Sequence, residues 1–385
     1  MSSGHVELPR LGEAHCATVH DKVGGGSMTD VQPRRPLPAK LAGHPSVRAV
    51  LARRESDGEA ATGRPAPVLD AAWLRELCLA AGADDAAAVS LDHPDLAGER
   101  EHVLAALPGT RSLVSLVVRM NRDDVRTPAR SVANQEFHRA GEIINDAARS
   151  VVRALEDAGH RALNPSATFP MEMQNYPGRI WVVAHKTVAV AAGLGAMGIH
   201  RNVIHPRFGN FVLLATVLVD AEVSGYGQEL DYNPCLECKL CVAACPVGAI
   251  GKAGEFDFMA CATHNYREFM GGFTEWVETI ADSADGAEFR ERVTDSENAS
   301  MWQSLSFKPN YKAAYCMAVC PAGEDVLGPY LDDRTEFMNT VFKPLRDKVE
   351  TLYVLPDSAA QEYAERRFPH KPVQRVSGGR RPPKP

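Results

Sequence analysis

The sequence predicts an α/β layer fold followed by a separate cysteine-rich segment. Helical patterns alternate with apolar strand patterns from about residue 67 onward. The stretches "RSLVSLVVRMN" (111–121) and "FGNFVLLATVLVD" (208–220) are long and strongly apolar, which is typical of strands buried in a sheet. Four cysteines then crowd into "CLECKLCVAACP" (235–246), a spacing that indicates a metal centre.

A first helix is expected from Asp70 to Gly82. Asp70 can accept a backbone hydrogen bond as the N-cap, and Gly82 ends the helical pattern. One face of this helix carries the apolar side chains, which are Trp73, Leu74, Leu77, Cys78 and Ala81. Cys78 is therefore interpreted as a small core residue and not as a ligand.

A second helix, a helix-like segment and two strands complete the α/β pattern. The strand at 111–121 is entered from the turn "LPGT". A helix follows whose apolar stripe ends at Gly159 and consists of Ile144, Ala148, Val151, Val152 and Leu155. After a loop around Tyr176-Pro177-Gly178, the helix-like segment "WVVAHKTVAVAAGLGAMG" (181–198) leads to the strand at 208–220.

Both ends of the chain are expected to be tails. Residues 1–65 and "VSGGRRPPKP" (376–385) are rich in Gly, Pro, Ala, Arg and Ser and have no sustained apolar period. The stretch "GGGSM" ends at Met28 and is what a translated ribosome-binding site before a start codon would encode, although a flexible linker explains it equally well. If translation begins at Met28 and not at Met1, Cys16 is not part of the protein.

Length and composition predict an intracellular globular protein of two domains. The chain has 385 residues, of which 45% are hydrophobic and 24% charged. The formal net charge of -7 gives no broad electrostatic footprint for nucleic acid, and no apolar run approaches the length of a membrane span. The pairs Arg34-Arg35 and Arg53-Arg54 lack the apolar region of an export signal, so a cytoplasmic location is expected.

The cysteine run has the spacing of iron–sulfur ligands. Cys235, Cys238, Cys241 and Cys245, followed by Pro246, form the pattern C-x2-C-x2-C-x3-C-P. Structural zinc sites usually divide their ligands into two separated pairs, and a disulfide framework suits a small secreted domain. The run therefore predicts an iron–sulfur cluster. Its fourth cysteine is carried onto the next helical turn and points toward a second cluster.

These motifs together resemble a known enzyme family. The segment "HKTVAVAAGLGAMGIHRNVIHPRFGNFVLLATVLVD" (185–220), the cysteine run, an isolated Cys261 and "CMAVCP" (316–321) are similar to the cobalamin-dependent reductases that include epoxyqueuosine reductase and the reductive dehalogenases. The likeness covers residues from about 67 to 330. It implies a nitroreductase-like α/β domain that binds base-off cobalamin, with an embedded ferredoxin-like module of two [4Fe-4S] clusters.

The resemblance also implies a division of the chain. Residues 1–65 would be a tail, 66–228 the nitroreductase-like and cobalamin-binding domain, 229–330 the ferredoxin-type domain, and 331–385 a C-terminal extension and tail.

The crossing rule of two-cluster ferredoxins assigns the ligands to two sets. Cys235, Cys238 and Cys241 pair with Cys320 around the first cluster. The second cluster takes Cys245, Cys261 and Cys316, but the family often has another cysteine three positions before Cys316, where this chain has Ala313. The alternatives are a [3Fe-4S] cluster, a non-cysteine ligand such as His264 or Asn310, or an exogenous water or thiol.

Residues around the glycine-rich segment are candidates for the cobalamin pocket. Small residues would let the backbone approach a large planar ring, and polar side chains lie nearby in the sequence. The candidates are His185, Lys186, Gly193, Gly195, Gly198, His200 and His205. The alternative is that the glycines permit close packing and end a helix, and that each histidine is an ordinary surface or core residue.

The proton donor of the family is not at its expected place. The acidic residue of epoxyqueuosine reductase aligns with Ala167 in "NPSATFPMEM". A carboxylic acid or a phenol must supply a proton when a carbon–heteroatom bond is reduced, so Glu172 and Tyr176 are the nearby candidates.

Two functions remain open at this point. In the first, low-potential electrons from a donor such as a ferredoxin or flavodoxin pass through both clusters to a cobalamin, which cleaves a carbon–oxygen or carbon–halogen bond of a small-molecule substrate. In the second, the chain is an electron-transfer protein without cobalamin that docks to a redox partner. A cavity wide enough for a corrin ring above the cluster-bearing helix would favour the first.

Overall fold

The computed structural model of this protein describes residues 38–56, 68–174 and 180–376. Contacts divide the chain into two units, Met1–Arg64 and Pro65–Pro385. In the first unit the described residues form α1 (Ala39–Ala42) and α2 (Pro45–Ser56), where the sequence predicts a tail. Ala, Leu and Arg in α2 are strong helix formers, but the helix has no apolar stripe that periodicity could detect. The other residues of the expected tails, 1–37, 57–65 and 377–385, lie outside the described residues.

A four-stranded antiparallel sheet organises the second unit. Its order is β1 (Asp85–Ser90), β2 (Ser112–Arg119), β6 (Val212–Val219) and β3 (Ala162–Leu163). The two predicted apolar strands are β2 and β6, which pair along their whole length, with Leu113 opposite Leu218 and Val117 opposite Leu214. Seven of the eight residues of β2 are buried, because both faces of the sheet are covered.

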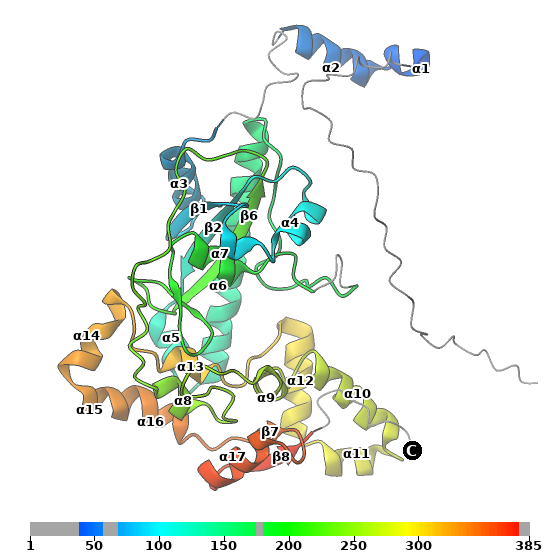
Figure 1. Ribbon diagram of the computed structural model, residues 1–385. Coiled ribbons are helices and arrows are strands. Elements are labelled where there is room, and N and C mark those ends of the chain that lie inside the picture. The colour runs from blue at the N-terminus through cyan, green and yellow to red at the C-terminus, as the bar shows by residue number, and fades with distance from the viewer. Residues whose placement is uncertain (1–37, 57–67, 175–179, 377–385) are drawn as a thin grey trace, which may run out of the picture. The chain divides into compact units, whose positions relative to one another are not determined.

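The long helix α6 (Arg130–Asp157) packs against β2 and β6 and covers one face of the sheet (Figure 1). The predicted stripe is confirmed, since Ile144, Ala148, Val151, Val152 and Leu155 are all buried. Gly159 has φ of 89°, a left-handed conformation that suits glycine just after a helix end.

The first predicted helix is α3 (Ala71–Ala80), and the Asp70 side chain accepts a hydrogen bond from the Trp73 backbone N–H at 2.8 Å. Leu74 and Cys78 are buried in the same core as the inner face of α6. The expectation that Trp73 shares this face is wrong, because its side chain is 41% exposed. α3 contacts β1 and α6 along a face narrower than the predicted one.

The opposite face of the sheet is covered by shorter elements. These are the 3-10 helix η2 (Pro94–Leu96), α4 (Arg100–Ala106) and α7 (His185–Ala191). Side chains of β2 alternate between the two faces of the sheet. Val114 and Leu116 pack in the core beneath α6, and Leu113 packs in the core on the opposite face, beneath η2, α4 and α7. α7 occupies the predicted helix-like segment and ends before Gly193.

The remaining elements carry or surround the cysteines. They are α5 (Arg122–Arg126), β4 (Ala196–Met197), β5 (Val203–Ile204), α8 (Leu240–Ala244), α9 (Phe258–Asn265), α10 (Gly271–Asp282), α11 (Gly286–Arg292), α12 (Asp295–Phe307), α13 (Tyr315–Ala318), α14 (Glu324–Asp332), α15 (Arg334–Phe337), the π-helix η3 (Met338–Phe342), α16 (Lys343–Arg346), β7 (Leu352–Val354), α17 (Ala359–Arg367) and β8 (Val373–Arg375).

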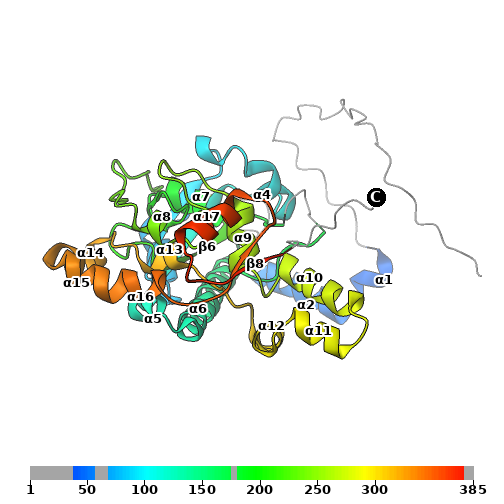
Figure 2. The same ribbon diagram turned by 90° about the horizontal axis from the view of Figure 1, so that it is seen from below.

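The cysteine-bearing elements are joined to the α/β part by a common core. α8 and α13, far apart in the sequence, contact each other (Figure 2). Buried residues of α13, among them Tyr315 and Ala318, belong to the same hydrophobic cluster as Ile144 of α6. Among the described helices, none is both long enough and apolar enough to cross a membrane.

Candidate iron–sulfur site and cavity

The structure gathers the cysteines into two groups. The first group consists of Cys235, Cys238, Cys241 and Cys320. Burial raises the pKa of the Cys320 thiol, and the nearby thiolates of the other three raise it further, so these four side chains are neighbours. Cys241 is also close to Cys316 of the second group, whose thiolate contributes to the raised pKa of Cys241. This group contains the four residues that the crossing rule assigns to the first cluster.

The second group consists of Cys245, Cys261 and Cys316. Burial raises the pKa of Cys261 to about 12, and the neighbouring thiolates of Cys316 and Cys245 contribute to the increase. Burial also raises the pKa of Cys316 to about 11, again with a contribution from Cys245. Thiols that raise one another's pKa need a cation to ionise together, which is what a group of iron ligands requires.

The backbone near the cysteines contains three left-handed residues that are not glycine. Glu237 and Lys239, between the first three cysteines, have φ of 48° and 60°. Ala314, two residues before Cys316, has φ of 56°. Left-handed conformations are costly for residues other than glycine and often mark functional sites.

The sulfur of Cys245 is surrounded by backbone donors. The Ala249 N–H donates to Cys245 Sγ at 3.2 Å. Burial raises the pKa of Cys245, while hydrogen bonds from the N–H groups of Val247, Ala249 and other residues of this turn oppose the increase. N–H donors around a buried sulfur stabilise a thiolate, so this residue fits an iron ligand.

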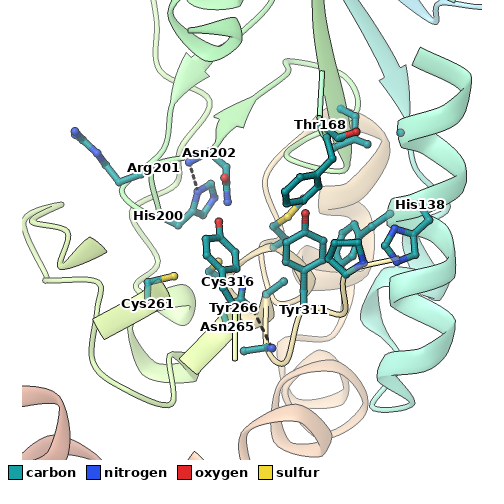
Figure 3. Close-up of a pocket in the computed structure, with 18 of the residues that line it drawn as sticks. His138, Thr168, His200, Arg201, Asn202, Cys261, Asn265, Tyr266, Tyr311 and Cys316 are labelled. Carbon is teal, nitrogen blue, oxygen red and sulfur yellow. Dashed lines mark hydrogen bonds between the residues drawn. The ribbon is translucent and has the colours of Figure 1, made fainter. Parts of the chain in front are cut away.

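A cavity of about 1040 Å³ lies between α6, the 164–170 segment, residues 200–202 and the second cysteine group (Figure 3). Cys245, Cys261 and Cys316 are among the residues that line it, whereas the four cysteines of the first group are not. In the first group Cys235 and Cys238 are partly exposed, and Leu236 between them is 45% exposed, whereas Cys241 and Cys320 are buried. A cluster held by the second group would therefore border the cavity, and the first would lie behind it.

Two phenols, those of Tyr266 and Tyr311, belong to the cavity wall. The Tyr266 and Tyr311 rings contact each other edge to face, with centroids 5.9 Å apart, and both line the cavity (Figure 3). In the described part of the chain, neither hydroxyl has a hydrogen-bond partner. Burial raises the pKa of both phenols, and the thiolates of Cys261 and Cys316 contribute to the increase at Tyr266.

Two histidines line the cavity with one ring nitrogen unpaired. On α6, opposite Cys261 across the cavity in Figure 3, His138 has a buried Nε2 without a partner among the described residues. On α9, His264 is 1% exposed, its Nδ1 accepts a hydrogen bond from the Tyr353 N–H at 3.3 Å, and its Nε2 has no partner in the described structure. Burial lowers the pKa of His264 to about 4, so its ring is neutral at pH 7.

A lysine lies beside the second cysteine group. Lys186 Nζ donates to the Arg201 carbonyl and to Asn202 Oδ1, each at 2.8 Å. Burial lowers the pKa of Lys186, and the thiolates of Cys316 and Cys261 oppose this decrease. Lys186 therefore places positive charge next to these sulfur atoms, where it offsets the negative charge of the thiolates.

The predicted pocket residues are divided by the structure. Lys186 and His200 line the cavity. His185 is bonded to Thr216 Oγ1 at 3.0 Å and to the Ser166 carbonyl at 3.1 Å, and His205 to Asp85 at 3.1 Å, and neither is a lining residue.

The three glycines are in close contact with other parts of the chain. A Cβ added at Gly193 would lie 2.1 Å from the Gln228 carbonyl oxygen, one at Gly195 would lie 2.6 Å from the Ile204 oxygen, and one at Gly198 would lie 2.7 Å from the Ile204 side chain. None of the three lines the cavity. These contacts favour the packing interpretation, and a role of the glycines in cofactor binding stays a prediction.

The predicted proton donors are not part of the described cavity wall. Glu172 is partly buried, its carboxylate accepts from the Gln174 N–H at 3.2 Å, and it is not a lining residue. Tyr176 lies outside the described residues. Sequence reasoning missed Tyr266, Tyr311 and His138. Tyr266 and Tyr311 each stand within five residues of a predicted cluster ligand in the sequence, and this proximity could have identified them.

Comparison with known proteins gives the chain its relatives. A family model described as a 4Fe-4S binding domain matches residues 229–251. Epoxyqueuosine reductase of Synechococcus sp. (strain RCC307) is 26% identical over 167 residues, which are 42% of this chain and 48% of that protein. Epoxyqueuosine reductase of Gloeobacter violaceus is 24% identical over 194 residues, 49% of this chain and 55% of that protein. The chain thus spans about half the length of these relatives.

Among solved structures, the comparison gives epoxyqueuosine reductase from Streptococcus thermophilus with a TM-score of 0.40, 15% identity, and coverage of 72% of this chain and 78% of that one. A reductive dehalogenase gives a TM-score of 0.42 at 14% identity, covering 64% of this chain and 38% of that one. The expected resemblance to epoxyqueuosine reductases is confirmed by the sequence matches, and the 4Fe-4S family model supports an iron–sulfur cluster at the cysteine run.

Proposed function

We propose that this protein is an iron–sulfur reductase that carries electrons through two clusters to a molecule bound in the cavity. The observation that carries the proposal is the unequal placement of the two cysteine groups, since the second lines the cavity and the first does not. α8 supplies Cys241 to the first group and ends at Cys245 of the second, so the two clusters would be adjacent. A donor such as a ferredoxin or flavodoxin would deliver low-potential electrons on the side of the first group.

The cavity suits a large cofactor, and cobalamin is the cofactor we propose. Its volume of about 1040 Å³ is at the upper limit of ordinary small-molecule pockets, which are roughly 300–1,000 Å³. The Nε2 atoms of His138 and His264 and the phenols of Tyr266 and Tyr311, which have no hydrogen-bond partner among the described residues, provide polar groups for a bound molecule. When bound, cobalamin supplies the redox chemistry at carbon that protein side chains lack.

The proposed reaction is the reductive cleavage of a carbon–oxygen or carbon–halogen bond in a small-molecule substrate. Two electrons and one proton convert the bond to carbon into C–H, and the oxygen or halogen leaves as an anion. The chain contributes the proton and the positioning. Tyr266 is the proposed donor, because its phenol lies in the cavity beside Cys261 and Cys316.

Cobalamin binding is tested by reconstituting the protein anaerobically with iron, sulfide and cobalamin. Cobalamin should elute with the protein in gel filtration and show the optical spectrum of the base-off form. Gly141→Leu should release it, because Gly141 is a buried glycine of α6 that lines the cavity. Gly98→Leu is the matched control, since Gly98 is exposed and has open space around it. If all cobalamin elutes free while both clusters are intact, the electron-transfer function without cobalamin becomes the better account.

The proton donor is tested with Tyr266→Phe. This substitution removes the hydroxyl and keeps the ring contact with Tyr311, so the iron content and the cluster spectra should not change. The rate of reductive cleavage should fall by about 10²–10⁴-fold, the usual contribution of general acid catalysis. Tyr311→Phe is the matched control with a smaller expected effect. An unchanged single-turnover rate for Tyr266→Phe would assign the proton to another group.

A further inference from the structure

We propose that this chain supplies only three ligands to the second cluster and leaves the fourth position, at Ala313, open to the cavity for a small carboxylate or hydroxide. The inference rests on the proposed function to the extent that it requires the second cluster to form. It differs from that function because it concerns a ligand-binding position at the cluster itself.

Ala313 stands where the family resemblance implies a cysteine ligand, and its backbone is held in place by hydrogen bonds, but its side chain has no atom that can bind iron. Ala313 lines the cavity, as do Cys245, Cys261 and Cys316. Its backbone N–H donates to Asn265 Oδ1 at 3.0 Å, and the Lys312 N–H donates to the Asn265 carbonyl at 3.1 Å. These two bonds hold the segment against the end of α9. A methyl group therefore occupies a defined place in the cavity wall where a thiolate would complete the set.

His264 is a poor replacement for the missing thiolate. A neutral imidazole has one protonated and one unprotonated nitrogen, and only the unprotonated one can bind a metal. His264 Nδ1 accepts the Tyr353 N–H, so the proton is on Nε2, the nitrogen without a protein partner. The ring thus presents an N–H donor and not a lone pair.

The other candidates are engaged elsewhere. The Asn310 side chain donates to Glu268 Oε2 at 2.9 Å, and Asn310 does not line the cavity. Cys78 belongs to the core around α6. Asn265, which does line the cavity, uses its Oδ1 to accept the Ala313 N–H. Within residues 38–56, 68–174 and 180–376, no cysteine other than the three of the second group lines the cavity.

The surroundings favour an anionic oxygen ligand. Lys186 lines the cavity, as Ala313 does, and its ammonium interacts with the thiolates of Cys316 and Cys261. The His264 Nε2–H is a buried donor without a partner among the described residues, and leaving such a donor unpaired is unfavourable. The Tyr266 hydroxyl is a further donor on the cavity wall. A carboxylate or hydroxide would accept from these donors and complete the ligand set.

The test compares reconstituted parent protein with Ala313→Cys, using acetate as the probe. In the parent, ¹³C-labelled acetate should give a ¹³C coupling in the electron–nuclear double resonance spectrum of the reduced second cluster. Brief oxidation should remove one iron and yield a [3Fe-4S] EPR signal. In Ala313→Cys both the coupling and the signal should be absent, because a fourth thiolate holds the iron. Ala314→Cys is the matched control, since it adds a thiol at the neighbouring lining position and should behave like the parent.

Other results overturn the inference in distinguishable ways. If the parent and Ala313→Cys have equal iron content, no acetate coupling and no [3Fe-4S] signal, a residue of the chain already fills the position. Loss of iron in His264→Ala alone would identify that residue as His264. If the parent and the variants all lack a second cluster, with about four iron atoms per chain, the proposed function fails and this inference fails with it.

Discussion

Replacing Cys261 with alanine is expected to remove the second cluster and leave the first intact. Cys261 lies with Cys245 and Cys316 on the cavity wall, and two thiolates cannot hold a four-iron cluster. The iron content should fall by about four atoms per chain, the size of one cubane. Reductive cleavage should fall to the background rate, because no cluster would then border the cavity. Iron and sulfide analysis and EPR of the reduced protein measure these effects.

Cys78→Ala is the matched control for this experiment. Cys78 is a fully buried cysteine that lies in the core formed by α3 and α6, away from the cavity. Its removal should lower stability only slightly and leave the iron content unchanged. Equal iron loss in both variants would show that the effect of Cys261→Ala comes from general destabilisation, and retention of all iron in Cys261→Ala would exclude Cys261 as a ligand.

Replacing Arg267 with alanine is expected to lower the free energy of unfolding by about 3–5 kcal/mol, the usual cost of removing one partner of a buried ion pair. Arg267 is 4% exposed and donates to Glu297 Oε1 from Nε at 3.0 Å and from Nη2 at 2.8 Å. It also pairs with Glu275 and lies over the Tyr353 ring. Its loss would leave the buried Glu297 carboxylate without its guanidinium.

Urea denaturation followed by tryptophan fluorescence measures this effect, because Trp276 and Trp302 lie on the helices that carry Glu275 and Glu297. Arg290→Ala is the matched control. Arg290 is exposed on α11, so its removal should change the free energy of unfolding by no more than about 0.5 kcal/mol. A cost below about 1 kcal/mol for Arg267→Ala would mean that water or another cation replaces the guanidinium.

Short sequence patterns predicted the features of the structure that are determined by residues close together in the sequence. The N-cap at Asp70, the strands β2 and β6, and the buried stripe of α6 each follow from a short pattern. The assignment of the cysteines to two clusters rests on their spacing and on the crossing rule of two-cluster ferredoxins, and it stays a prediction.

The cavity could not be predicted in this way, because its wall comes from separate parts of the chain. His138 is on α6, Lys186 on α7, Tyr266 follows α9, and Tyr311 precedes α13. No single sequence window contains them. The packing role of the glycines at 193, 195 and 198 could not be predicted for the same reason. The atoms that leave no room for a Cβ at these positions belong to Gln228 and Ile204, in other segments of the chain.

The central claim is that the second cysteine group holds a cluster next to the molecule in the cavity, and EPR of protein loaded with cob(II)alamin tests it most directly. The redox potential of the solution is set so that the clusters are reduced while the cobalt remains in the paramagnetic Co(II) state. The account predicts that the cobalt signal is split or broadened by a neighbouring cluster spin in the parent, and that the splitting is lost in Cys261→Ala. A bound cobalt signal that is identical in the two proteins would contradict the account.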